Sequence, residues 1–205
     1  METLKSTFKP FLKHLNQQKE KIAYLQLIGK LEEYLVKEFC YYVFLNSKGK
    51  EFAVINMGSN KEQKLDICIL SGKNLDDPEI KFMIEAKYFR NKHRFRYNAT
   101  DEITTTLKSL NSQMHDSNVE THGWFKVSPY VKKIFGLVFL SYISEEKNIQ
   151  EKEKYYQRII KTAKENLNNL KVLDNMSEDV YDDIEVKLIN KTFFVTLKAG
   201  LWEKL

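Results

Sequence analysis

Two strand-like stretches carry charged residues where apolar residues are expected. The stretch "KFMIEAKYFR", residues 81 to 90, holds Glu85 and Lys87 two residues apart, and "KLDICIL", residues 64 to 70, holds Asp66. A lone buried carboxylate is costly, so charges kept in such places are generally paired or coordinate a metal ion. Two carboxylates and a lysine are also the groups that metal-assisted hydrolysis of a phosphodiester uses.

The pleat of a strand decides whether these three side chains can meet. Side chains alternate between faces, so Glu85 and Lys87 share one face, roughly 6.5 to 7 Å apart along the strand, while the opposite face is apolar. If the two strands are neighbours, a spacing of about 4.8 Å brings Asp66 and Glu85 close enough to share one cation. Hard oxygen ligands together with water and a phosphate oxygen suit Mg²⁺ or Mn²⁺. Lys87 would then assist the attacking water.

The alternative is an ordinary strand face on which Glu85 and Lys87 form ion pairs in contact with solvent. An isolated E-x-K triplet is common and favours that interpretation. Asp66 is flanked by apolar residues on its own short strand, and its presence favours a metal-binding site over a solvent-facing ion pair.

An aspartate on one strand and E-x-K on the next resembles the PD-(D/E)XK nuclease superfamily, which includes type II restriction endonucleases, archaeal Holliday-junction resolvases and phage exonucleases. The matching residues are Asp66 in "LDICIL" and Glu85 and Lys87 in "IEAK", while Leu65 stands where the motif has proline. The resemblance covers about residues 20 to 143. It implies a restriction-endonuclease-like fold, Asp66 and Glu85 as metal ligands, Lys87 as a catalytic residue and DNA as the substrate.

Members of that superfamily often carry a further acid on the first helix. At ~100° per residue from Ile28, Glu32 falls within the apolar arc that contains Leu35, which makes it a candidate third metal ligand. The alternative, equally weighted, is that Glu32 lies at the edge of this arc and reaches solvent. Gln113, near the end of the second helix, is a candidate to face the site, as polar residues on this helix do in some relatives.

A basic segment follows the E-x-K triplet directly. The run "KYFRNKHRFRY", residues 87 to 97, contains Arg90, Lys92, Arg94 and Arg96 and no acid. Such a run beside a phosphate-handling site would hold a nucleic-acid backbone and make binding depend on salt. The expected partner is DNA, with RNA not excluded; the alternative is a solvated loop.

The elements that must position these residues follow from hydrophobic periodicity and turn signals. We expect a helical region over about residues 11 to 39, four strands over 40–46, 51–57, 64–70 and 80–89, a helix from about 100 to 114, a strand buried on both faces over 133–143, a charged helix over 144–170 and a hairpin of 184–190 and 192–199 that turns at Asn190-Lys191. This order predicts an α/β fold with a mixed central β-sheet flanked by helices. We expect one domain over residues 1–205, with its core at about 20–143 and a C-terminal helix and hairpin over 144–205.

Composition narrows the class of protein. A hydrophobic content of 42% in 205 residues indicates an ordered domain, and a formal net charge of +5 is compatible with an anionic partner. The two cysteines are far apart in apolar settings and do not predict a thiolate zinc site. Because no signal peptide or membrane span is recognisable, we expect a cytoplasmic protein without a membrane partner.

These patterns predict a divalent-metal-dependent nuclease that hydrolyses DNA, with an endonuclease favoured and a role in restriction, repair, recombination or phage defence. Cutting two strands often takes two sites, so a homodimer is plausible. The first alternative is a catalytically inactive nucleic-acid-binding or assembly module that keeps the fold. The second is a structural protein whose charged strand faces pair ionically.

Overall fold

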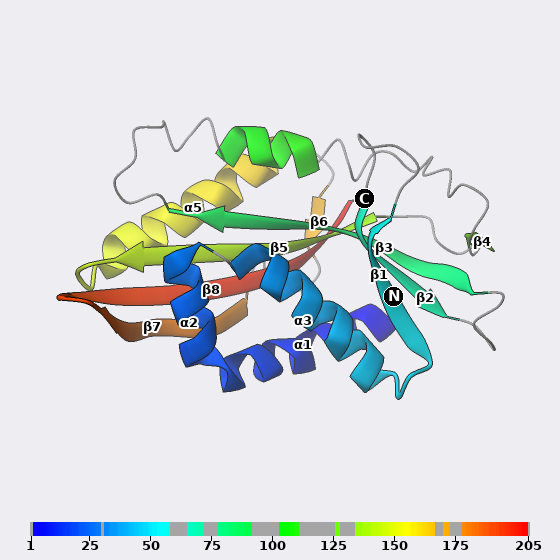
Figure 1. Ribbon diagram of the computed structural model, residues 1–205. Helices are drawn as coiled ribbons and strands as arrows, with labels where there is room; N and C mark the ends of the chain where they lie inside the picture. The colour runs from blue at the N-terminus through cyan, green and yellow to red at the C-terminus, as the bar shows by residue number, and fades with distance from the viewer. Residues whose placement is uncertain are drawn as a thin grey trace.

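The computed structural model describes residues 2–29, 31–57, 65–71, 78–91, 103–110, 126–127, 134–166, 170–172 and 178–204. These residues form three layers, in which a mixed β-sheet has helices on both faces (Figure 1). The expected α/β class with a mixed central sheet is therefore confirmed.

Eight strands are formed by the described residues, in the order β1-β2-β3-β5-β8-β6, with β4 beside β3 and β7 beside β8. Strand β3 runs parallel to β4 and β5, and the other pairs are antiparallel. The strands are β1 (Glu51–Met57), β2 (Leu65–Ser71), β3 (Glu79–Arg90), β4 (Lys126–Val127), β5 (Ile134–Ser144), β6 (Leu170–Val172), β7 (Glu178–Leu188) and β8 (Lys191–Lys204).

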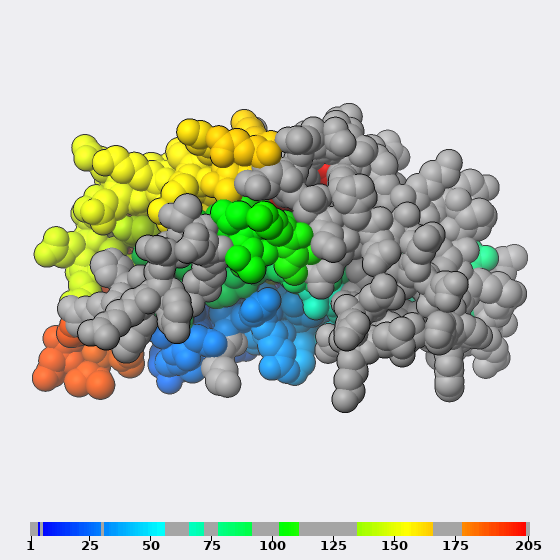
Figure 2. Space-filling model, turned by 90° about the horizontal axis from the view of Figure 1, so that it is seen from above, coloured from blue at the N-terminus to red at the C-terminus, as the bar shows by residue number. Residues whose placement is uncertain are grey.

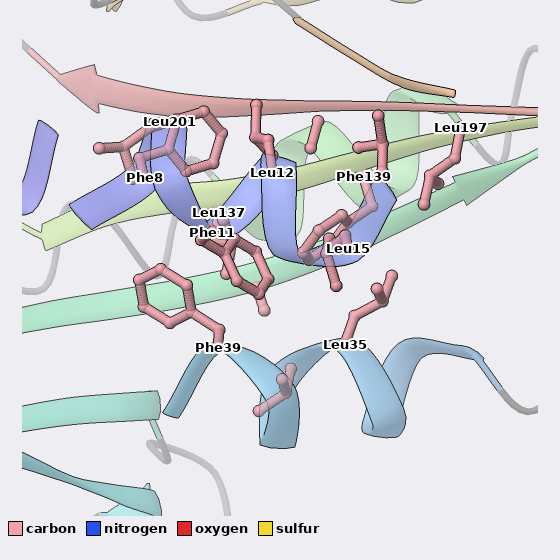
Figure 3. Close-up of a cluster of buried hydrophobic side chains, with 14 of the residues drawn as sticks. Phe8, Phe11, Leu12, Leu15, Leu35, Phe39, Leu137, Phe139, Leu197 and Leu201 are labelled. Carbon is pink, nitrogen blue, oxygen red and sulfur yellow. The ribbon is translucent and has the colours of Figure 1, made fainter. Parts of the chain in front are cut away.

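Three helices, α1 (Glu2–Gln17), α2 (Lys19–Ile28) and α3 (Leu31–Asn46), pack on one face of the sheet. Apolar residues of α1 and α3 recur at three- and four-residue spacing and meet the apolar face of β5 and β8 (Figure 3). Phe11 of α1 and Phe39 of α3 are fully buried, with an edge-to-face contact between rings 5.1 Å apart. This layer covers the face of β3 that carries Ile84 and Ala86.

The opposite face is covered by the helical segment 103–110 and by α5 (Ile149–Asn166), which lie next to each other in Figure 2. Leu107 and Leu110 from the first segment and Ile159 from α5 pack against this face. Met83 and Phe89 of β3 lie in the same cluster. Since Glu85 and Lys87 fall between these two residues in the alternation of β3, both charges belong to this face of the sheet.

The N-terminal helical region differs from the expectation of one helix over about 11–39. Gly29 ends α2 in the left-handed conformation, with φ of 76°, and α3 starts at Leu31. Helix α3 then continues through residues 40–46, which were expected to be a strand. Val43 extends the buried stripe of Leu35 and Phe39, so packing of this stripe overrides the strand preference of the aromatic and β-branched residues.

The C-terminal hairpin belongs to the central sheet and is not an added extension. Strand β8 pairs with β5 from Phe135 opposite Glu203 to Ser144 opposite Phe194. The turn lies at Ile189-Asn190, one residue before the expected position, because Leu188 pairs with Lys191. No helix of the described residues is both long and apolar enough to cross a membrane.

Candidate active site

Asp66 and Glu85 lie on neighbouring antiparallel strands, which meets the condition on which the sequence argument depended. The last pair of the β2–β3 ladder is Ile67 with Ile84, and Asp66 and Glu85 each lie one residue beyond this pair. Beyond this pair, the Asp66 side chain replaces a backbone acceptor: its Oδ2 accepts a hydrogen bond of 2.8 Å from the backbone N–H of Ala86. This bond fixes the Asp66 carboxylate against β3.

Glu85 is the most buried charged residue of this group, with 1% of its surface exposed. Its Oε1 accepts a hydrogen bond from the Lys87 ammonium, which is 17% exposed. Its Oε2 is buried and accepts no hydrogen bond from a donor in the described part of the chain. The Asp66 carboxyl is close enough to form a hydrogen bond with Glu85 when one of the two acids is protonated. A buried carboxylate oxygen without a donor carries a large desolvation cost. A cation or hydrogen-bond donor bound to this atom would offset that cost.

The electrostatics of Glu85 reflect this setting. Its pKa is raised to about 7: burial raises it most, Lys87 opposes the shift, and the charge of Asp66 and a hydrogen bond with the Asp66 carboxyl add to it. The protonated and ionised forms of Glu85 are therefore balanced near neutral pH. A positive charge placed beside Oε2 would favour the ionised form.

Glu32 is an exposed residue in the first turn of α3, the helix that packs on the face of the sheet opposite to Glu85. The helical wheel that placed it in the apolar arc began at Ile28, which belongs to α2, so the break at Gly29 invalidates that angle. The pKa of Glu32 is nevertheless raised, first by desolvation and also by Asp66, while Lys87 opposes the shift. Glu32 is thus near enough to interact electrostatically with Asp66 and Lys87, and its role as a metal ligand stays a prediction.

Arg90 ends β3 and contacts the end of α2. Its guanidinium donates a 3.3 Å hydrogen bond to the carbonyl of Leu27, one of the carbonyls that the helix leaves unpaired. A Cβ added at Gly29 would lie 3.4 Å from Nη1 of Arg90, and the backbone at this position has a positive φ. Glycine adopts a positive φ without strain, which explains its presence here. This contact fastens α2 to β3, and binding of nucleic acid by Arg90 stays a prediction.

The remaining predicted site residues, Lys92, Arg94, Arg96 and Gln113, lie outside the described residues. Within the described ranges, no group of three or more His, Cys, Asp and Glu side chains is placed to hold a metal ion. Of the predicted site residues, the structure brings together Asp66, Glu85 and Lys87. A cation bound here would have two protein ligands from β2 and β3, the carboxylates of Asp66 and Glu85.

Sequence reasoning missed Gly136, which pairs with Glu85 across the β3–β5 ladder. The signal was in the sequence, because a glycine inside a buried apolar strand often marks the close approach of a ligand or another chain segment. Which strand pairs with β3, and in which register, could not be read from the sequence.

Comparisons of the chain with models of protein families, with curated proteins and with solved structures find no match.

Proposed function

We propose that this protein is a divalent-metal-dependent nuclease that hydrolyses phosphodiester bonds of DNA. In this proposal Asp66 and Glu85 bind the metal and Lys87 assists the nucleophile. The observation that carries the proposal is the buried pair of acids: the Glu85 carboxylate lies beside Asp66, with one oxygen bound to Lys87 and the other without a donor in the described residues.

The donor set fits Mg²⁺ or Mn²⁺. Mg²⁺ keeps several waters and is usually held by one or two carboxylates and by substrate phosphates, so Asp66 and Glu85 suffice on the protein side. A cation bound there would polarise a phosphoryl oxygen and supply a water nucleophile near neutral pH. The unpaired Oε2 of Glu85 supports this fit, because a cation would satisfy it.

The residues of the chain have separable roles in this scheme. Asp66, held by the Ala86 N–H, presents a fixed carboxylate. Lys87 keeps the Glu85 carboxylate oriented and offsets negative charge on a phosphate or on an attacking water. Glu32 would add a third negative charge at the edge of the site, and Lys92, Arg94 and Arg96 would hold the nucleic-acid backbone.

The finer assignments belong to the same proposal. The strand order that carries Asp66 before the E-x-K strand, and the parallel β5 after it, supports a restriction-endonuclease-like core. Cleavage of both strands of a duplex by one active site per chain would call for a homodimer. We favour an endonuclease of DNA and propose a role in restriction, repair, recombination or phage defence.

A second candidate function is a nucleic-acid-binding or assembly module without catalysis. The observation that favours it is the Glu85–Lys87 ion pair, which already neutralises both groups, together with the missing third ligand in the described residues. Such a module would bind nucleic acid in a salt-dependent manner but would need no divalent cation.

Cleavage assays separate the two candidates. Supercoiled, linear, branched and single-stranded DNA would be incubated with Mg²⁺ or Mn²⁺ and with the wild type, Glu85→Gln or Lys87→Ala. We expect the wild type to cleave at least one substrate and each variant to lose about a hundredfold or more in rate. The exposed α5 residues provide matched controls, Glu153→Gln and Lys154→Ala, which should cleave at the wild-type rate. Cleavage that survives both site substitutions would reject the proposed function.

A further inference from the structure

Strand β1 lies at one end of the strand order, and among the described residues only β2 pairs with it. The N–H of Glu51 donates a 3.0 Å hydrogen bond to the hydroxyl of Ser47, which precedes the strand, so the backbone of Glu51 points away from β2. Residues of an antiparallel ladder alternate in this respect, and Ala53 and Ile55 therefore also direct their N–H and C=O groups to the outer side. No described residue forms a backbone hydrogen bond with them there.

The sequence of β1 gives this outer edge no protection. Natural edge strands are generally kept from pairing with other chains by charges, proline or bulges. Residues 52 to 57 are Phe, Ala, Val, Ile, Asn and Met, and the register of β1 with β2 has no shift. Ala53 and Ile55 are half-buried against the helical layer, and Phe52 and Val54 are half-buried against the opposite cluster. A strand that is apolar on both faces is typical of the interior of a sheet.

Strand β7 is a protected edge of the same sheet. Among the described residues it pairs only with β8, and it carries Asp179, Asp182, Asp183 and Glu185. Its register with β8 shifts between residues 179 and 184. The acids would repel a second copy of β7, and the irregular register would interrupt a new ladder. This contrast identifies β1 as the edge suited to pairing.

The end of α3 extends the apolar surface towards the start of β1. Tyr41, Phe44 and Leu45 are large side chains that are between 46% and 55% exposed. The ring of Phe44 lies beside the turn into β1, since a Cβ added at Gly49 would be 3.6 Å from it. Burial of these side chains would add apolar area to a contact made at this edge.

We propose that β1 is the interface through which two copies of this chain form a twofold dimer, with the two β1 strands paired antiparallel. A twofold axis perpendicular to a sheet makes equivalent edge strands antiparallel, so one sequence supplies both sides of the ladder. Residues 52–57 carry no charge, so two copies meet there without repulsion. A second copy is present wherever the chain is, whereas an unprotected apolar edge that waits for another protein invites aggregation.

In such a dimer the sheet continues across both subunits and keeps the two Glu85 carboxylates on the same face. The inference uses only the edge strand and its surroundings, and it does not depend on the proposed metal site.

The test is the oligomeric state of the full chain in EDTA, measured by sedimentation velocity over a range of protein concentrations. Ala53→Pro removes an outward N–H, a change that edge strands tolerate, and Ile55→Lys places a charge in the edge. Because the interface is symmetric, the proline removes two hydrogen bonds per dimer, and we expect dimerisation to weaken by about a hundredfold, tenfold for each bond. Ile55→Lys should weaken it at least as much. The matched control is Val186→Lys on β7, also half-buried against the helical layer, which should dimerise as the wild type does.

Hydrogen exchange locates the interface. In the wild type, the amides of Ala53 and Ile55 should exchange more slowly as the protein concentration rises, because pairing protects them. The Val186→Lys control should keep this concentration dependence, and the amide of Ala53 should lose it in Ile55→Lys.

A monomeric wild type would overturn the inference, and so would a dimer that both β1 variants leave unchanged or whose protected amides lie outside β1. If Ala53→Pro does not fold, Ile55→Lys decides alone, since a monomer supports the inference and an unchanged dimer overturns it. Because all these measurements are made without divalent cations, none of their outcomes bears on the proposed nuclease activity, which the cleavage assays test separately.

Discussion

At the scale of single residues, Glu85 carries most of the functional argument. Burial alone would make it a neutral acid, and a solvent-facing ion pair would leave both of its oxygens hydrated. It is instead 1% exposed, paired with Lys87 through one oxygen only, and next to a second carboxylate. Like charges and desolvation act in the same direction on such a group, and groups perturbed in this way are concentrated at functional sites.

The raised pKa of Glu85 predicts how stability depends on pH in the absence of metal. The folded state holds the Glu85 proton up to about pH 7, whereas the unfolded chain releases it near the ordinary value of 4.5. Between these values the folded state binds more protons, so the free energy of unfolding should fall as pH rises from about 4.5 to 7 and then level off. The full contribution is about 3 kcal/mol.

The measurement is urea denaturation of the wild type and Glu85→Gln between pH 4.5 and 8.5. Because glutamine does not titrate, the free energy of unfolding of the variant should lack the fall with pH that Glu85 causes. The stability of the variant relative to the wild type should therefore increase as pH rises. A difference between the two proteins that is constant across this range would contradict the assignment of a raised pKa to Glu85.

The sequence predicted these residues well and their surroundings poorly. Alternation within one strand was enough to place Glu85 and Lys87 on one face, whereas the position of Asp66 beside them depends on the register of β2 with β3. The unpaired oxygen of Glu85 and the adjacent Gly136 depend on pairing between β3 and β5, which are far apart in the chain. The angle on which the Glu32 prediction rested does not hold, because one αL glycine resets the helical phase, and its role as a metal ligand stays a prediction.

At the scale of elements, α2 is anchored to the sheet through Gln26, a fully buried amide. Its Nε2 donates to the hydroxyl of Ser141 and to the carbonyl of Thr196, and its Oε1 accepts from the hydroxyl of Tyr181. Together with the bond from Arg90 to Leu27, these contacts attach α2 to four strands, β3, β5, β7 and β8.

Replacing Gln26 by leucine keeps the volume and removes all three hydrogen bonds. We expect the free energy of unfolding to fall by about 2 to 4 kcal/mol, because the polar groups of β5, β7 and β8 would stay buried without partners. Urea denaturation measures this change, with Gln17→Leu on the exposed face of α1 as the control. A loss under about 0.5 kcal/mol, the range of ordinary surface substitutions, would show that this network does not anchor α2.

The tip of the β7–β8 hairpin predicts a stabilising substitution. Ile189 has φ of 56° and is 93% exposed, so it adopts a backbone conformation unfavourable for a β-branched residue and buries almost nothing. Ile189→Gly should raise the free energy of unfolding by about 1 kcal/mol, since glycine adopts this conformation without strain. An unchanged or lower Tm by calorimetry would contradict the strain at this turn.

Elements were predictable to the extent that one local pattern dominated. The strands of Asp66 and Glu85 and the buried strand β5 lie where periodicity placed them, to within a residue or two. The strand predicted for residues 40–46 was wrong. Their aromatic and β-branched composition favours a strand, but packing of Val43 in the buried stripe of α3 stabilises the helix. The hairpin was found, but its place inside the sheet requires the long-range pairing of β5 with β8.

At the scale of the whole molecule, the sheet separates two layers that differ in chemistry. One face is sealed by α1, α2 and α3 over an apolar core, and the other carries Glu85 and Lys87 among apolar residues beneath the helical segment 103–110 and α5. In the proposed function, the basic run that follows β3 in the sequence is expected to contact the nucleic-acid backbone. The formal net charge of +5 is compatible with such a partner.

Salt dependence of DNA binding tests this basic run. Binding would be measured with Glu85→Gln in EDTA, so that cleavage does not interfere, at several salt concentrations. Replacing Lys92, Arg94 and Arg96 together by glutamine should reduce the slope of log K against log salt by about 2 to 3, the number of phosphate contacts removed. The same change at the exposed Lys161 and Lys164 of α5 should leave the slope unchanged. Equal slopes for all three proteins would show that Lys92, Arg94 and Arg96 do not contact the DNA backbone.

The most direct measurement of the central claim is the binding of Mn²⁺ to the metal-free protein by titration calorimetry at pH 8, where Glu85 is ionised. If Asp66 and Glu85 form a cation site, the wild type should bind Mn²⁺ at this site, and Asp66→Asn and Glu85→Gln should each lose that binding while remaining folded. A wild type that takes up no Mn²⁺, or variants that bind it as the wild type does, would contradict the account.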